Sequence, residues 1–182
     1  APQTTRDSEG RRVMEGWIRM PKPAEEGWIG MFCLPRIVER KGNHIYFRIH
    51  PNVRAAYSKE ITDISCASED GYMAVFELED GETADIGGFL IKRKGNRIQT
   101  DRTAVYPSFE GAHLLSETPE LTDGCRIEVL ADKNLIEVYI NDGEYVISNA
   151  VYGIGDFIKV NIEKTVHLYT LKEHGERTRG EE

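Results

Sequence analysis

The sequence predicts an all-β protein that folds as an antiparallel β-sandwich or barrel. Short runs rich in β-branched and aromatic residues alternate with turn residues along most of the chain. No segment has the length and periodicity of an ordinary helix. One stretch, 125–149, holds three alternating strands separated by two tight turns. Many short strands at even spacing, with turns between them, are typical of sandwiches and barrels.

The first sixty residues are expected to form four strands and a linker. A polar start with a turn at 7–10 precedes them. The expected strands are, in order, 13–20, 28–34, and a hairpin formed by 36–40 and 44–49. Residues 51–59 favour one helical turn, which we interpret as the connection to a second set of strands.

The second set of strands occupies most of the remaining chain. We expect strands at 61–67, 72–79, 84–92, 96–100, 157–162 and 166–171, in addition to the three strands of 125–149. Turns at 69–71 and 93–95 predict hairpins between the strands on either side of them. A long loop is expected at 103–123. The tail after residue 172 is charged, has no apolar face and is expected to be disordered.

The three strands of 125–149 form the clearest pattern. Apolar residues recur at every second position, which indicates strands with one buried face. Ile127 and Val138 represent the inward positions of the first two strands. The turns are 132–134 and Asn141-Asp142-Gly143, and the second is a strong hairpin signal because these residue types tolerate positive φ. The stretch therefore predicts an antiparallel meander.

Composition limits the classes of partner. The 182 residues carry a net charge of −8, with 40% hydrophobic residues. This balance disfavours nucleic acid and anionic membranes as partners, because binding to phosphate needs a basic surface. No apolar run approaches the ~20 residues of a membrane span. Cys33, Cys66 and Cys125 form an odd, widely spaced set that indicates free thiols and favours a reducing compartment such as the bacterial cytoplasm.

Residues 127–152, IEVLADKNLIEVYINDGEYVISNAVY, resemble the hallmark of the C-terminal β-sandwich of glycoside hydrolase family 32, the invertases, sucrose-6-phosphate hydrolases and fructanases. The structural family motif comprises Asp132, Glu137, Asn141, Asp142 and Gly143. Tyr139 replaces the Phe that is more usual in the family, and Glu144 completes the pattern.

Two segments near the N-terminus extend this resemblance. APQTTRDSEGRRVMEGWI, at 1–18, resembles the stretch that closes the five-bladed propeller of the family. WIGMFCLPRIVERKGNHIYFRIHPNV, at 28–53, resembles the Leu-Pro-Arg strand and hairpin that follow, although Ile37 stands where the family usually has Glu. The chain begins with Ala1 rather than Met, which we interpret as processing or as the cut end of a longer protein.

The resemblance implies a domain division and a function. It predicts a remnant of the catalytic propeller at 1–52, a linker at 53–60, a jelly-roll-like sandwich at 61–172 and a disordered tail at 173–182. The parent protein would hydrolyse sucrose, sucrose 6-phosphate or fructans. The sandwich would support its own catalytic propeller and is a candidate for homodimer contacts. Substrate would reach this chain only through the parent enzyme.

The chain alone is predicted to be inactive. Family members hydrolyse fructosides with retention, which needs two carboxyl groups about 5–5.5 Å apart. The family's Asn-Asp-Pro-Asn, Arg-Asp-Pro and Glu-Cys-Pro motifs are absent, since Arg6-Asp7 is followed by Ser8 and no Cys-Pro occurs. We therefore assign no catalytic residue. Asp132 and Glu137 are better interpreted as exposed carboxylates of a hairpin than as an acid pair, because an acid catalyst needs a pocket that raises its pKa.

No cofactor or metal site is predicted. The five histidines lack paired ligand spacing, and Cys-X-X-Cys is absent. Residues 141–144 lack the alternating oxygen ligands of a calcium loop and fit a turn better.

Aromatic residues supply the remaining site candidates. Trp17 is the one candidate for substrate contact, because the matching Gly-Trp element of the family approaches the substrate cleft, with plain packing as the alternative. Trp28 is expected in the core, and Arg102 is expected to form a structural ion pair. A stand-alone carbohydrate-binding module is the alternative function, and a pure interaction domain is a third. Such a module needs an exposed aromatic platform, for which the candidates are Tyr72, Tyr106, Phe109 and Tyr152.

Overall fold

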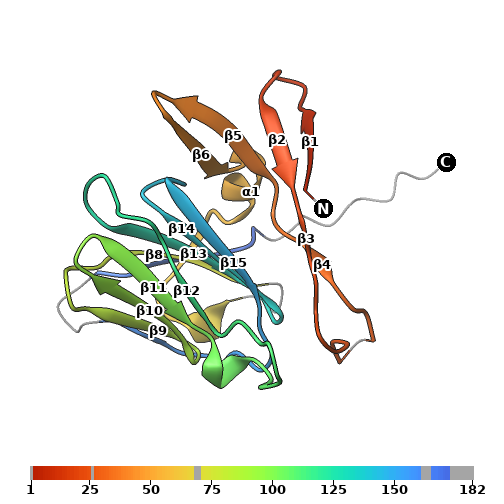
Figure 1. The fold of residues 1–182 in the computed structure, drawn as a ribbon, viewed down its shortest axis with the longest axis vertical. Coiled ribbons are helices and arrows are strands. Elements are labelled where there is room, and N and C mark those ends of the chain that lie inside the picture. Colours follow the sequence, from red (N-terminus) through yellow and green to blue (C-terminus); the bar gives the residue numbers. More distant parts are fainter. Residues whose placement is uncertain (1, 26, 68–70, 161–164, 173–182) are drawn as a thin grey trace.

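The computed structural model describes residues 2–25, 27–67, 71–160 and 165–172, and within them it confirms an all-β sandwich. Two antiparallel sheets face one another, and a smaller N-terminal sheet lies beside them (Figure 1). The predicted tail at 173–182 lies outside the described residues, as do residues 161 and 162 of the expected strand 157–162 and the side chain of Cys66. Cys33 and Cys125 are free, as expected, and both are buried.

The sandwich consists of a six-stranded and a five-stranded sheet. The first has the order β15-β14-β13-β8-β17-β7, and the second has the order β12-β11-β10-β9-β16. The six strands are β7 (Lys59–Ile61), β8 (Tyr72–Glu77), β13 (Arg126–Ala131), β14 (Leu135–Ile140), β15 (Tyr145–Ala150) and β17 (His167–Thr170). The five are β9 (Thr83–Ile86), β10 (Phe89–Lys94), β11 (Arg97–Asp101), β12 (Leu115–Glu117) and β16 (Ile158–Lys159).

The main core lies between these two sheets. Val129 on β13 stands opposite Val138 on β14, and both are fully buried. Ile91 on β10 and Ile98 on β11 extend into the same core from the facing sheet. Each such side chain contributes about 1.5–3 kcal/mol on burial. The meander predicted for 125–149 is thereby confirmed, with its alternating apolar residues on the inner face.

The N-terminal segment forms its own small sheet and covers the outer face of the meander. Its strands are β1 (Gln3–Arg6), β2 (Arg12–Glu15), β5 (Arg36–Lys41) and β6 (His44–Ile49), in the order β1-β2-β5-β6, with a separate ribbon of β3 (Trp17–Ile18) and β4 (Met31–Phe32). Helix α1 (Pro51–Ala56) follows and confirms the expected helical turn. A second apolar cluster, which includes Ile49, Leu130 and Tyr139, fills the space between this segment and the meander.

Two strand predictions in the sandwich are wrong. Residues 61–67 do not continue as a strand, because the Asp63 side chain accepts a hydrogen bond from Ser65 N at 2.8 Å and starts the 3₁₀ turn η1 (Ile64–Cys66). Among the described residues, strand β17 lies between β7 and β8 and pairs with both, so these two strands do not form the predicted hairpin; residues 69 and 70 of its turn lie outside the described residues. Residues 84–92 form two strands, since Gly87 and Gly88 adopt φ values of 57° and 98° and turn the chain between β9 and β10.

Three further differences concern short elements. The expected strand at 28–34 is reduced to the two residues of β4. The long loop at 103–123 contains the 3₁₀ turn η2 (Thr103–Val105) and strand β12. Strand β1 was not predicted, because its residues are polar and exposed, and its pairing with β2 alone holds it.

Candidate functional site: the junction between the N-terminal sheet and the sandwich

A buried ion pair joins strand β5 to strand β14. The Arg36 guanidinium of β5 pairs with the Glu137 carboxylate, whose side chain is 0% exposed. The Tyr139 hydroxyl and the Ser148 hydroxyl each donate a hydrogen bond to the same carboxylate at 2.8 Å. A buried carboxylate is tolerated when such partners replace the water that it has lost. We use the name "junction" for the contacts of Arg36, β6 and α1 with strands β13–β15.

The junction shifts the pKa of two of its groups. Burial raises the pKa of Tyr139 well above its ordinary value, and the charge of Glu137 adds to the effect. Burial alone would lower the pKa of Arg36, but the neighbouring Tyr139 and Glu137 outweigh it and raise that pKa. Tyr139 therefore stays a neutral donor and Arg36 a permanent cation.

A second buried carboxylate ties helix α1 to strand β13. Glu128 is 0% exposed and receives two hydrogen bonds from Arg54 of α1, at 2.5 and 3.1 Å. Arg126 adds an ion pair at 2.8 Å from its own strand. Burial opposes ionisation of Glu128, but the hydrogen bonds of the two arginines prevail and lower its pKa. The carboxylate is thus charged and fully paired.

The turn between β14 and β15 is the third contact of the junction. Asn141 and Asp142 have φ values of 48° and 57°, as the hairpin signal predicted. The carbonyl of Gly143 accepts a hydrogen bond from Phe47 N at 2.8 Å, and Arg48 pairs with the Asp142 carboxylate. A Cβ on Gly143 would collide with the carbonyl oxygen of Phe47, so the close approach requires glycine.

The polar neighbours of this turn hold its shape. The Asn141 side chain donates to Asp123 O at 2.6 Å and to the Glu144 carboxylate at 2.9 Å. Glu144 in turn accepts from Thr122 N at 2.7 Å. The carbonyl of Glu144 lies 2.7 Å from the His44 Nε2 of β6. Four of the five residues of the family motif, Glu137, Asn141, Asp142 and Gly143, are therefore placed in or beside the junction.

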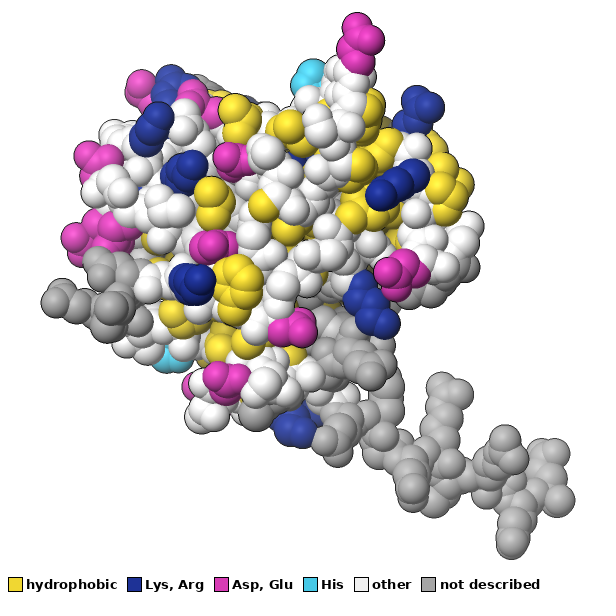
Figure 2. Space-filling model, turned by 90° about the horizontal axis from the view of Figure 1, so that it is seen from below, with side chains coloured by type: hydrophobic (Ala, Val, Ile, Leu, Met, Phe, Trp, Pro, Cys, Tyr) yellow, Lys and Arg dark blue, Asp and Glu magenta, His cyan; other side chains and the backbone are white. Residues whose placement is uncertain are grey.

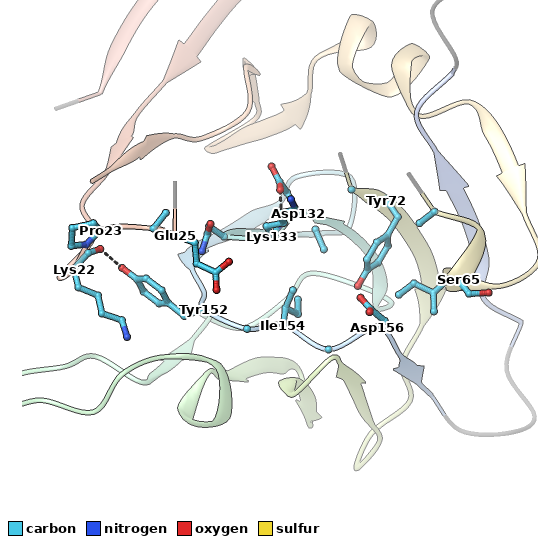
Figure 3. A pocket seen from close by; sticks show the side chains of 18 residues that line it. Lys22, Pro23, Glu25, Ser65, Tyr72, Asp132, Lys133, Tyr152, Ile154 and Asp156 are labelled. Carbon is cyan, nitrogen blue, oxygen red and sulfur yellow. Dashed lines mark hydrogen bonds between the residues drawn. The ribbon is translucent and has the colours of Figure 1, made fainter. Parts of the chain in front are cut away.

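Asp132, the fifth residue of the motif, lies elsewhere. It caps the β13–β14 turn by accepting a hydrogen bond from Lys133 N, and it lines a cavity of about 840 Å³. We call this cavity the "rim cavity" (Figure 3). The interpretation of Asp132 and Glu137 as exposed hairpin carboxylates is wrong for Glu137, which is buried and fully paired. The structure does not place the two as an acid pair.

The tryptophans and Arg102 lie outside the junction's ion pairs. Trp17 on β3 is 49% exposed and stands against Gly30, so its role as a substrate contact stays a prediction. Trp28 is 40% exposed, so its expected place in the core is wrong. Arg102 donates hydrogen bonds to His113 O at 2.7 and 2.9 Å and to Ala150 O at 3.0 Å, where an ion pair was expected.

The aromatic candidates for a binding platform come together only in part. Tyr106 lies with its ring centroid 6.1 Å from that of Phe109 and 5.8 Å from that of Tyr152. The Arg102 guanidinium covers the Tyr106 ring at 3.6 Å, which removes one face from any ligand. Tyr72 is buried and lines the rim cavity together with Tyr152. The four rings therefore do not form one exposed platform.

Sequence reasoning missed most of the junction's partners: Arg36, Arg54, Arg126, Glu128 and Ser148. A signal was present in the two strands IEVLA and LIEVYI, each of which carries one Glu among apolar residues. We assigned the alternate positions to solvent, which is the usual arrangement for an antiparallel sheet. In this chain the outer face of the meander is covered by the N-terminal segment, so the same Glu residues become buried.

Two further kinds of site can be addressed for the described part of the chain. No group of three or more His, Cys, Asp or Glu side chains there is arranged to hold a metal ion. Within the same residues, no helix is long and apolar enough to cross a membrane.

Comparison with known proteins places the chain in a family. A family model described as "Glycosyl hydrolases family 32 C terminal" matches residues 48–174. The sucrose-6-phosphate hydrolase of Vibrio alginolyticus is 24% identical over 94% of this chain. That of Bacillus subtilis (strain 168) is 26% identical over 81% of it. The structure of sucrose-6-phosphate hydrolase from Lactobacillus gasseri is similar with a TM-score of 0.74 at 14% identity, over 94% of this chain.

The chain spans only part of each of these proteins: 38% of the Vibrio protein, 35% of the Bacillus protein and 41% of the Lactobacillus chain. The family match covers the whole sandwich as described, including the meander and its motif. This chain belongs to glycoside hydrolase family 32 and contains the C-terminal domain of that family.

Proposed function

We propose that this chain is the C-terminal, non-catalytic part of a β-fructofuranosidase, and that its sandwich braces a catalytic propeller. Residues 1–52 complete that propeller, 53–60 link the two parts, and 61–172 form the bracing sandwich. The relatives that support this proposal are named as sucrose-6-phosphate hydrolases, and sucrose or sucrose 6-phosphate is accordingly the proposed substrate of the whole protein.

The buried Arg36–Glu137 pair carries the proposal. It joins a residue of the N-terminal sheet to a residue of the sandwich 101 positions away, in a place closed to solvent. A buried ion pair is sensitive to geometry, because each charge needs the other in place. The Gly143 turn holds the same two parts at a second point, and the Arg54–Glu128 contact ties the linker to the sandwich. Two contacts therefore hold the N-terminal sheet on the sandwich, and a third holds the linker.

Exposed apolar side chains on the N-terminal segment support the proposal that a catalytic propeller packs against it. Five of the eight large hydrophobic side chains that are exposed in the described chain lie between residues 17 and 45, namely Trp17, Trp28, Ile29, Phe32 and Ile45. Phe32, on β4, is 66% exposed. Figure 2 shows hydrophobic side chains lying open on one face of the molecule between charged ones. Such surfaces mark places where another protein surface packs.

Exposure also supports Trp17 as a contact for the substrate. Its indole is half exposed on the β3–β4 ribbon, which places it on the segment assigned to the propeller. In the whole protein, Trp17→Ala is expected to raise KM more than it lowers kcat. Trp28→Ala, on the same segment with a similar exposed fraction, is the matched control. An equal effect of the two substitutions would contradict the contact.

The proposal is tested by comparing this chain alone with the same chain joined to its catalytic propeller. Alone it is expected to release no glucose from sucrose. The joined protein is expected to hydrolyse sucrose or its 6-phosphate with retention of configuration. Hydrolysis by the purified chain alone would overturn the non-catalytic assignment. Homodimer formation, the remaining part of the proposal, is tested on the joined protein by light scattering after size-exclusion chromatography.

A further inference from the structure

The ribbon of β3 and β4 lies beside β15 of the sandwich (Figure 1). Ile18 and Met31 are cross-strand partners in this ribbon, and both pack on a small apolar cluster that includes Ala150 of β15. Trp17 and Phe32 form the other cross-strand pair, and their side chains are 49% and 66% exposed. Because successive residues of a strand point to opposite faces, these two aromatic side chains lie on the face of the ribbon that is turned away from the sandwich.

Two hydrogen bonds hold the backbone next to Trp17. Cys33 N donates to Gly16 O at 2.8 Å, and Gly16 N donates to the Cys33 Sγ at 3.0 Å. These bonds extend the ribbon by one residue pair beyond Trp17 and Phe32, and the side chain of Cys33 is buried. The main freedom left to Trp17 is therefore the rotation of its own side chain.

Gly30 limits that rotation. It directly precedes β4 and has a φ of 100°. A Cβ at this position would lie 2.4 Å from the Nε1 of Trp17 and 2.6 Å from its Cε2 and Cζ2, so the indole lies against the glycine backbone. Ordinary Cβ contacts begin at 3.4 Å, and a larger residue would therefore displace the indole by about 1 Å. The indole would move rather than the ribbon, since the atoms that collide belong to a side chain.

We propose that Gly30 is a positioning residue for Trp17, and that the lack of a side chain at Gly30 lets the indole lie in the orientation that contacts the substrate. This inference rests on the substrate contact proposed above for Trp17. Gly30 acts through the indole alone. Binding groups must be held to within about 0.5 Å of their productive positions, so a displacement of about 1 Å is large enough to weaken the contact.

The first test measures the placement of the indole in the 182-residue chain. The chain contains two tryptophans, so in a Trp28→Phe background all tryptophan fluorescence comes from Trp17. Gly30→Ala is expected to shift the emission maximum to longer wavelength and to increase quenching by acrylamide, because an indole pushed off the ribbon is more exposed to water. Circular dichroism of the same samples verifies that each variant is folded.

Gly27→Ala is the matched control. Gly27 lies in the same connection between β3 and β4 and has a φ of 91°, so an Ala there imposes a similar backbone strain. A Cβ on Gly27 would meet no atom of the described residues within 4 Å, in contrast to one on Gly30. This substitution should leave the fluorescence of Trp17 unchanged.

The second test measures hydrolysis of sucrose or its 6-phosphate by the joined protein. Gly30→Ala should raise KM about two- to tenfold, the usual value of one lost aromatic contact, with a smaller change in kcat. In a Trp17→Ala background the same substitution should have no further effect on KM, because the indole through which Gly30 acts has been removed. Gly27→Ala should leave KM unchanged.

The outcomes separate this inference from the proposed function. The positioning role is overturned if Gly30→Ala changes neither the fluorescence of Trp17 nor KM, if Gly27→Ala changes them equally, or if the effect on KM persists in the Trp17→Ala background. A KM that Trp17→Ala raises and Gly30→Ala does not overturns the positioning role alone. If Trp17→Ala leaves KM unchanged, the substrate contact is wrong and the positioning role is wrong with it. A joined protein without activity contradicts the proposed function, and the fluorescence comparison then tests the placement of the indole by itself.

Discussion

Replacing Arg36 by Ala tests the junction most directly. The substitution leaves the Glu137 carboxylate, which is 0% exposed, without its only arginine partner in the described structure. Removing one member of a buried ion pair typically costs about 3–5 kcal/mol, because the remaining charge is left uncompensated. Tyr139 and Ser148 still donate to Glu137, so we expect the lower end of this range, about 3 kcal/mol. That is a large share of the ~5–15 kcal/mol that stabilises an ordinary domain.

The measurement is urea unfolding followed by far-ultraviolet circular dichroism and by tryptophan fluorescence, which reports on the N-terminal segment. Arg48→Ala is the matched control, because Arg48 pairs across the same junction with Asp142, a side chain that is 53% exposed. An exposed pair contributes about 0–1 kcal/mol. The double variant Arg36→Met/Glu137→Leu removes both charges and should recover only part of the loss, because the Tyr139 and Ser148 hydroxyls then lose their acceptor. A cost for Arg36→Ala no larger than that for Arg48→Ala would refute the reasoning.

Three further predictions concern other parts of the chain. Glu128→Gln removes the charge that two arginines bind, and it should lower the free energy of unfolding by about 1–3 kcal/mol in the same urea experiment. Gly143→Ala should cost at least 1 kcal/mol more than Gly42→Ala, because both have positive φ but only the former would collide with a carbonyl of β6; thermal unfolding compares them. Burial opposes ionisation of Asp7, but hydrogen bonds from Arg11 prevail and lower its pKa to about 2. The stabilisation of the β1–β2 turn should therefore be complete above the ordinary pKa of 3.8 and be lost as the pH falls toward 2, which amide hydrogen exchange in that turn would report.

The meander was predictable from the sequence because two local rules agree there. Alternating apolar residues define its inner face, and Asn141-Asp142-Gly143 defines its turn. The β9–β10 hairpin was not predictable in the same way, since Gly87-Gly88 interrupts an otherwise apolar run that is also consistent with one long strand. Pairing of β7 with the distant β17 depends on contacts more than 100 residues apart, which no local pattern encodes.

Local sequence patterns also could not predict the contacts of the candidate site. The position of Glu137 in its strand assigns it to the face opposite Val138, but whether that face meets water depends on a segment 101 residues earlier. Only the family resemblance marked Glu137 in advance, and it gave no partner. The rim cavity was also beyond local reasoning, because Tyr72 lies on β8 and Asp156 lies in the loop before β16, and only the fold brings these two segments to one cavity.

The polar character of the junction is itself an argument for its proposed role. Every residue of β14 is buried, so an entirely apolar outer face would have been compatible with the fold. Apolar surfaces bind without strong preference for register, whereas a buried carboxylate accepts only an arrangement that brings a cation to it. Arg36 meets Glu137 in the interior, and Gly143 admits the backbone of β6 at the edge. Two such constraints at separate points leave one orientation of the N-terminal sheet on the sandwich, as the proposed bracing role requires.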